Sequence, residues 1–113
     1  MNPQTKLYLL NEQGQRFFGD GPCRLLKLVE ETGSLRAAAQ EMGMAYTKAM
    51  RLLRQAELAM DTPLTERVIG GTGGGGSRLT KAGKELVEKY EQCRMQCVEA
   101  NRRICAEIFG GNG

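Results

Sequence analysis

The order of apolar and polar residues predicts two short strands near the N-terminus. Apolar side chains dominate residues 6–10, the polar residues 11–14 have the composition of a turn, and residues 16–18 return as a second strand. Glycine and proline then break the pattern at residues 19–22. Residues 1–20 are therefore expected to hold a small hairpin or an edge ribbon.

Two helices are expected next, joined by a short turn. An apolar stripe at residues 25–29 predicts a helix over residues 22–31, with Gly33 as its C-terminal stop. Ser34 stands where an N-cap belongs, directly before the alanine-rich and strongly helix-prone residues 35–42. The small alanine side chains allow another helix to approach closely.

A third helix is predicted over residues 45–60, after a break at Gly43. Its inner face is expected to hold Ala45, Ala49, Leu52, Leu53, Ala56 and Met60. Its outer face carries Thr47, Lys48, Arg51 and Arg54. Two helices joined by a glycine turn have the pattern of a helix-turn-helix. Any compact helical hairpin uses similar residues, and the basic outer face is what favours a DNA-binding motif.

The remainder of the chain is predicted to form a two-stranded ribbon and one long helix. Residues 64–69 and 78–80 have strand character and enclose a polyglycine tip, so residues 64–80 form the ribbon. A ribbon that follows a helix-turn-helix makes a winged helix. From Lys81 the pattern is helical throughout residues 81–109. The expected fold is mainly α with a small β component.

Length and composition restrict the class of protein. The 113 residues have room for one domain of ordinary size, expected to span residues 1–113. No apolar run approaches the ~20 residues that cross a bilayer, and no signal peptide is visible, so a cytoplasmic protein is expected. The absence of histidine excludes His-based triads and His-ligated zinc. No nucleophile–base pair or carboxylate pair stands out, so we expect neither an enzyme nor a cofactor.

The net charge of +3 is concentrated in the middle of the chain. Residues 44–84 carry seven basic and three acidic side chains, whereas residues 1–43 are neutral and residues 85–113 carry a charge of −1. This distribution suggests a surface that faces a polyanion such as double-stranded DNA, but charge alone favours a solvated basic face without a partner. The candidate DNA-binding residues are Tyr46, Thr47, Lys48, Arg51, Arg54, Arg67, Arg78, Lys81 and Lys84.

The polyglycine tip also contains the dinucleotide-binding pattern G-x-G-x-x-G at residues 71–76. No βαβ unit surrounds this pattern, and Ser77 stands where a phosphate-binding loop requires lysine, so nucleotide binding is disfavoured. Two other interpretations stay open, namely a flexible linker and a nest of backbone N–H groups that binds an oxyanion.

Apolar residues of the last helix recur at spacings of four and three, as in a coiled coil. This seam consists of Leu86, Tyr90, Cys93, Cys97, Ala100, Ile104 and Ile108. Because a domain of this size cannot easily cover so long a helix, we expect the seam to pack against a second copy in a homodimer. The alternative is an amphipathic helix that folds back on the core of its own chain.

Two of the four cysteines lie on this seam and suggest further chemistry. Cys93 and Cys97 are four residues apart, so two chains side by side could form a four-sulfur site for zinc or copper(I). The sequence contains no C-x-x-C motif, and a cytosolic cysteine is usually a small buried hydrophobe. Packing is therefore preferred over a redox role, a disulfide between chains or a metal site.

Several segments resemble known bacterial regulators. Residues 33–44, GSLRAAAQEMGM, resemble the helix-turn-helix of LysR-type and ModE-type proteins. The sequence LTER at residues 64–67, the glycine run, and LTKAG at residues 79–83 are specifically similar to the ModE type, as is the lead-in at residues 7–21. The similarity extends over roughly residues 5–90.

This resemblance implies a dimeric winged-helix domain, with residues 45–60 as the recognition helix and residues 66–80 as the wing. ModE-type regulators control molybdate uptake and molybdenum-enzyme genes, and they sense the oxyanion through separate C-terminal domains. This chain ends where those domains would begin, so its effector is unknown and a molybdate-binding domain is expected to be absent. Ala45 replaces the family's capping serine and Met50 its tryptophan.

The leading hypothesis is a homodimeric transcriptional regulator that binds a pseudo-palindromic operator through recognition helices about 34 Å apart. Thr47, Lys48 and Arg51 are expected at base edges or nearby phosphates with Tyr46 beside them, and the other cations at phosphates. The alternatives are a cysteine-based metal or redox sensor and an oxyanion-binding protein of a single domain.

Overall fold

Four helices and two small antiparallel sheets make up the part of the chain that this computed structural model describes, residues 1–69 and 76–110. In chain order the elements are β1 (Leu9–Leu10), β2 (Arg16–Phe18), α1 (Asp20–Thr32), α2 (Leu35–Glu41), α3 (Tyr46–Met60), β3 (Thr65–Val68), β4 (Gly76–Leu79) and α4 (Lys81–Ile108). Each sheet is a two-stranded pair, β1 with β2 and β3 with β4. The predicted winged helix-turn-helix with a long C-terminal helix is confirmed.

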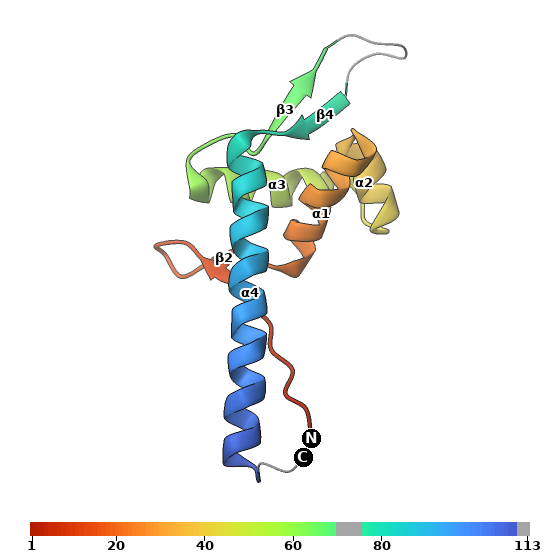
Figure 1. Cartoon of the computed structure of the whole chain (residues 1–113). Coiled ribbons are helices and arrows are strands. Elements are labelled where there is room, and N and C mark those ends of the chain that lie inside the picture. The colour runs from red at the N-terminus through yellow and green to blue at the C-terminus, as the bar shows by residue number, and fades with distance from the viewer. Residues whose placement is uncertain (70–75, 111–113) are drawn as a thin grey trace.

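The long helix α4 sets the shape of the molecule, which measures 59 × 30 × 25 Å. In Figure 1, α1, α2, α3 and the β3–β4 wing gather around the N-terminal half of α4. The N-terminal segment runs beside the other half of the helix. There the Asn101 side-chain amide donates a hydrogen bond of 2.7 Å to the Thr5 hydroxyl. One side of this half of α4 is therefore covered by the chain's own N-terminus.

The predicted hairpin at residues 1–20 is present but smaller than expected. Its first strand is restricted to Leu9–Leu10 instead of residues 6–10, and the register shifts between these two residues. In the turn that follows, the side-chain oxygen of Asn11 accepts hydrogen bonds from the backbone of Gln13 and Gln15. The side chain of Asn11 therefore organises this turn.

Local capping explains where the three N-terminal helices begin and end. α1 begins at Asp20, two residues earlier than expected, and Gly33 ends it in the left-handed region with a φ of +74°. The Ser34 hydroxyl accepts a hydrogen bond of 3.0 Å from the Ala37 N–H, so the predicted N-cap of α2 is confirmed. Gly43, with a φ of +67°, makes the turn before α3.

The core lies between these three helices, the β2 strand and the first turns of α4. Its fully buried members are large apolar residues: Phe18, Leu25, Leu26, Val29 and Leu64. α3 contributes Ala49, Leu53 and Ala56, as predicted. The prediction for Ala45 and Met60 is wrong, because both are exposed. Ala45 precedes the first turn of α3, and Met60 closes its last turn, beyond the part that packs on the core.

Backbone hydrogen bonds hold the wing against the helix-turn-helix. The Ser77 N–H donates to the Gly33 carbonyl (2.8 Å), and the Leu79 N–H donates to the carboxylate of Glu30 on α1 (2.9 Å). The carboxylate of Glu57 on α3 accepts from the Leu64 N–H (2.9 Å). These contacts fix the position of β3 and β4 relative to α1 and α3.

The long helix α4 begins with a cap and a close backbone contact. The Thr80 hydroxyl accepts from the Gly83 N–H (3.0 Å) and donates to the Pro63 carbonyl (2.8 Å). Gly83 is buried, and a Cβ added there would collide with the Leu64 carbonyl oxygen. α4 ends at Ile108, one residue earlier than expected.

Two of the predicted dimerisation residues lie instead in the core of their own chain. Leu86 is 6% exposed and Tyr90 is 2% exposed, and the Tyr90 ring meets the Phe18 ring edge-on at 5.2 Å between centroids. The predicted seam role is wrong for this pair, because the first turns of α4 cover α1 and β2. The alternative of a helix folded on its own core therefore holds for this part of α4.

Candidate nucleic-acid interface

The outer face of α3 carries the predicted polar and basic residues in exposed positions. Thr47, Lys48, Arg51 and Arg54 are all exposed, whereas Ala49, Leu53 and Ala56 face the core. Successive helix residues turn by about 100°, so Thr47, Arg51 and Arg54 form one stripe opposite the buried residues. This stripe is the exposed surface of α3.

A groove separates this stripe from the wing. It has a volume of about 630 Å³ and is lined by Tyr46, Met50 and Arg54 of α3 together with Thr65, Arg67 and Ser77 of the wing. Figure 1 shows the β3–β4 ribbon rising next to α3. The structure therefore brings three of the predicted DNA-binding residues, Tyr46, Arg54 and Arg67, to one groove.

Two acidic residues also line the groove, Glu57 and Asp61. The Glu57 carboxylate accepts a hydrogen bond of 2.9 Å from the Leu64 N–H. Asp61 is the C-cap of α3. Neither lies among the Thr47, Arg51 and Arg54 side chains of the exposed stripe.

The remaining predicted contacts lie outside this groove. On the wing, the Arg78 guanidinium forms an exposed ion pair of 3.0 Å with Glu66 on the facing strand. Such surface pairs contribute little stability and exchange readily with a stronger anion. Lys81 and Lys84 are exposed on the first turn of α4, directly after the wing. These three cations therefore border the wing without lining the groove.

Sequence reasoning assigned no role to Arg36, which lies beside this groove. Its guanidinium carbon is 4.2 Å from the centroid of the Tyr46 ring, a cation–π contact between α2 and α3. Tyr46 therefore packs under Arg36, on the helix-turn-helix itself, while its ring also lines the groove. The spacing of residues 36 and 46 across a turn gives no sequence signal for this contact.

Two of the four cysteines, Cys23 and Cys97, have raised pKa values. Burial raises the pKa of Cys23 to about 11, and the carboxylate of Glu91 adds to this shift. Partial burial also raises the pKa of Cys97, and the nearby Cys93 adds to the shift. A raised pKa lowers the fraction of reactive thiolate. Among residues 1–69 and 76–110, no group of three or more cysteine or carboxylate side chains is placed to hold a metal ion.

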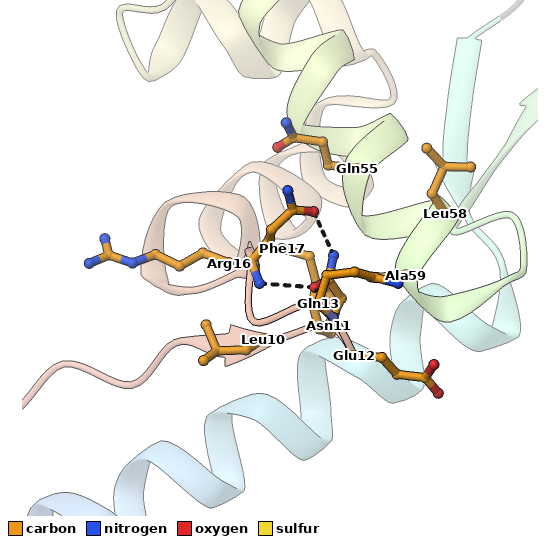
Figure 2. A pocket seen from close by; sticks show the side chains of 10 residues that line it. Leu10, Asn11, Glu12, Gln13, Arg16, Phe17, Gln55, Leu58 and Ala59 are labelled. Carbon is orange, nitrogen blue, oxygen red and sulfur yellow. Dashed lines mark hydrogen bonds between the residues drawn. The ribbon is translucent and has the colours of Figure 1, made fainter.

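A second hollow lies on the other flank of α3, against the β1–β2 hairpin (Figure 2). Its polar lining includes Asn11, Gln13, Gln15 and Gln55, together with one cation, Arg16, and one acid, Glu12. Its lining therefore has no excess of positive charge and offers no surface for a polyanion.

Two further expectations concern other parts of the molecule. The glycine-rich tip, for which a linker and an oxyanion nest were considered, falls almost entirely in residues 70–75, outside the described residues. None of the helices that the structure describes has the length and apolar content needed to cross a membrane.

The family described as bacterial regulatory helix-turn-helix protein, lysR family, matches residues 23–84. This match includes α1, the helix-turn-helix, the wing and the start of α4, more than half of the chain. The chain belongs to this family, whose members are regulators and not enzymes. The predicted LysR-type resemblance is confirmed.

Curated relatives belong to the ModE group. The chain is 37% identical over 95 residues to the molybdenum transport protein ModE of Herbaspirillum seropedicae, covering 84% of this chain and 34% of that protein. It is 36% identical over 90 residues to the transcriptional regulator ModE of Yersinia pestis, covering 78% and 34%. It is 33% identical over 90 residues to the DNA-binding transcriptional dual regulator ModE of Escherichia coli (strain K12), also covering 78% and 34%. The chain spans about a third of the length of these relatives.

Proposed function

We propose that this protein is a ModE-type transcriptional regulator that binds double-stranded DNA through α3 and the wing. The observation that carries the proposal is the groove where Tyr46, Arg54 and Arg67 meet, beside the exposed stripe of α3. An α-helix fits the major groove, and cations at its borders neutralise phosphates. The similarity to named ModE regulators supports the same function.

Within this interface the residues have different roles. Thr47, Lys48 and Arg51 lie on the exposed side of α3 and contact base edges or adjacent phosphates. Five cations around the wing contact phosphates: Arg54, Arg67, Arg78, Lys81 and Lys84. Phosphate contacts set the register of the protein on DNA but do not read its sequence. In this assignment Arg78 exchanges its ion pair with Glu66 for a phosphate.

We further propose that the protein acts as a homodimer through the C-terminal part of α4. The seam residues beyond Tyr90 remain partly or fully accessible in the single chain, with Ile104 45% and Ile108 72% exposed. Cys93, Cys97 and Ala100 continue this stripe. Two such stripes packed together would bury these side chains, and the dimer would present two recognition helices to a pseudo-palindromic operator.

The dimer is tested by one seam variant and one matched control. Ile104→Asp places a charge in the seam, whereas Met95→Asp changes an exposed residue, 61% accessible, nine positions earlier and half a turn around the helix. Sedimentation equilibrium should show a dimer for the natural chain and for Met95→Asp, and a monomer for Ile104→Asp. Equal masses for all three proteins would contradict the proposed seam.

The names of the relatives link the proposal to molybdenum. The relative from Herbaspirillum seropedicae is called molybdenum transport protein ModE, and the proposal extends this link to the genes that the present chain regulates. Because the family is described as bacterial and bacterial DNA lies in the cytoplasm, the proposed site of action is the cytoplasm.

Selection of bound sequences from a pool of random duplex DNA tests the function directly. The proposal predicts enrichment of one motif with two inverted half-sites, about 10 base pairs or a multiple apart. Arg51→Ala should relax the preference at one position of each half-site, since a base contact is lost. The proposal fails if the pool shows no enrichment over a mock selection.

A further inference from the structure

The stack of Arg36 on Tyr46 joins the two helices of the helix-turn-helix at their N-terminal ends. Arg36 is the second residue of α2 and Tyr46 the first residue of α3. The guanidinium carbon lies 4.2 Å from the ring centroid, so the planar group covers one face of the ring. A stacked arginine loses little further freedom when its N–H groups form hydrogen bonds.

The guanidinium has no acidic partner that would explain its position. Among the residues that the structure describes, no ion pair and no side-chain hydrogen bond involves Arg36. Its side chain is exposed, whereas the Tyr46 ring beneath it is half-buried. The N–H donors at the edge of the stacked group are therefore available to an external acceptor.

The location of the stack points to the kind of acceptor. Tyr46 lines the groove that also holds Arg54 and Arg67, and Leu35, the neighbour of Arg36, lines it as well. In a helix-turn-helix the first helix crosses the DNA backbone while the second enters the major groove. Arg36 belongs to that first helix, so the group it meets on DNA is a phosphate.

We propose that Arg36 is a phosphate-contacting residue of the DNA interface and that Tyr46 is a positioning residue that holds its guanidinium. This inference rests on the proposed function and assigns a contact that the charge pattern of residues 44–84 does not include. It also gives Tyr46 a role that does not require its hydroxyl to read a base.

The test measures how affinity depends on salt for a fluorescein-labelled mixed-sequence duplex of 30 base pairs. For Arg36→Ala the slope of log K against log[salt] should fall by about 0.9 per protomer, and affinity near 0.1 M salt by roughly five- to tenfold. Tyr46→Leu should cause a similar loss, and the double variant no greater one, because both remove the same contact. Tyr46→Phe, which keeps the ring, should restore most of what Tyr46→Leu loses.

The matched control is Arg16→Ala, because the Arg16 guanidinium lies 4.0 Å from the centroid of the Tyr8 ring in the N-terminal hairpin. This control removes the same kind of stack outside the helix-turn-helix and should leave the slope unchanged. Circular dichroism and urea unfolding establish that each variant is folded. If Tyr46→Leu does not fold, the salt slopes of Arg36→Gln and Arg36→Lys are compared instead. Only lysine keeps the positive charge, so Arg36→Gln should lose slope and Arg36→Lys should keep it.

Two results would overturn the inference in different ways. If Arg54→Ala lowers the slope but folded Arg36→Ala does not, the stack is structural and the proposed function still holds. If the natural chain shows no salt-dependent binding to the duplex, the proposed function and this inference fail together.

Discussion

At the scale of single residues, Gly83 allows α4 to pack closely against the start of the wing because it has no side chain. Its Cα faces the carbonyl of Leu64, which also accepts the Thr80 N–H at 3.0 Å. Any Cβ at this position would collide with that carbonyl oxygen. The L-T-x-x-G pattern of residues 79–83 is therefore a packing requirement, with Thr80 as the cap and Gly83 as the contact.

The first prediction follows from this contact. Gly83→Ala should lower the free energy of unfolding by about 2 kcal/mol, because the wing must shift to make room for the methyl group. Urea unfolding followed by circular dichroism measures the loss. Gly21→Ala is the control, since nothing lies within 4 Å of a Cβ there, and it should be neutral or slightly stabilising. Equal stability of both variants would contradict the close contact.

The second prediction concerns the thiol of Cys23. Burial raises its pKa from 9.0 to about 11, so between these values the unfolded chain releases a proton that the folded chain retains. Stability should therefore be independent of this thiol below pH 8 and should fall as pH rises from 9 to 11. The Tyr90 hydroxyl, whose pKa is raised by burial and by Asp20, acts in the same direction at higher pH.

Urea midpoints under reducing conditions between pH 7 and pH 10.5 measure this dependence. Cys23→Ala should be less stable at pH 7 but should lose less stability on the way to pH 10.5 than the natural chain does. Cys105→Ala removes a half-exposed thiol and should keep the natural profile. An identical alkaline decline in all three proteins would show that the Cys23 thiol does not contribute.

At the scale of elements, the two helices of the helix-turn-helix differ in their capping. The Ser34 hydroxyl caps α2, whereas Ala45 precedes α3 without any side-chain cap, as the sequence predicts. Ala45 nevertheless has the extended backbone of an N-cap, with φ −65° and ψ 145°. α3 therefore lacks a side-chain oxygen that would accept a hydrogen bond from an N–H group of its first turn, although the backbone of Ala45 has the shape of a cap.

The third prediction uses this difference. Ala45→Ser should raise the free energy of unfolding by about 1 kcal/mol, and Ser34→Ala should lower it by a similar amount. Urea unfolding of the two single variants and of the double variant measures both effects, which should nearly cancel. A loss of stability in Ala45→Ser would mean that the N-terminal N–H groups of α3 have another partner.

The sequence predicts the elements well because their signals are local. Glycine stops, the serine cap and the 3.6-residue periodicity specify α1 to α3 within about two residues. The role of Leu86 and Tyr90 was not predictable in this way, because an apolar seam has the same spacing against its own core and against a second chain. Which surface covers it depends on how α4 packs over α1 and β2.

In the candidate interface, too, some features follow from local sequence signals and others depend on tertiary packing. The exposed stripe of α3 follows from periodicity alone, and so does the exposure of Thr47, Arg51 and Arg54. The meeting of Arg54 with Arg67 in one groove, and the stack of Arg36 on Tyr46, depend on tertiary contacts between separate elements. No local pattern encodes such contacts.

At the scale of the whole molecule, different features lie at the two ends of α4. The helix-turn-helix and wing gather at the N-terminal half of α4 (Figure 1). The exposed apolar residues Ile104 and Ile108 lie in the other half. The ends are separated along a molecule that is 59 Å long, so a second copy can pack on one end without covering the other. This separation is what a dimeric DNA-binding protein requires.

The most direct test of this account compares the salt dependence of DNA affinity for two double variants. Arg54→Ala with Arg67→Ala removes both cations of the groove, whereas Arg102→Ala with Arg103→Ala removes the same charge from the far end of α4. Fluorescence anisotropy with a duplex obtained by the selection described above measures log K against log[salt].

We expect the groove variant to lose about 0.9 units of slope for each phosphate contact removed, and the control variant to keep the natural slope. Equal slopes for the natural chain and the groove variant, or an equal loss in both double variants, would contradict the assignment of α3 and the wing as the DNA interface.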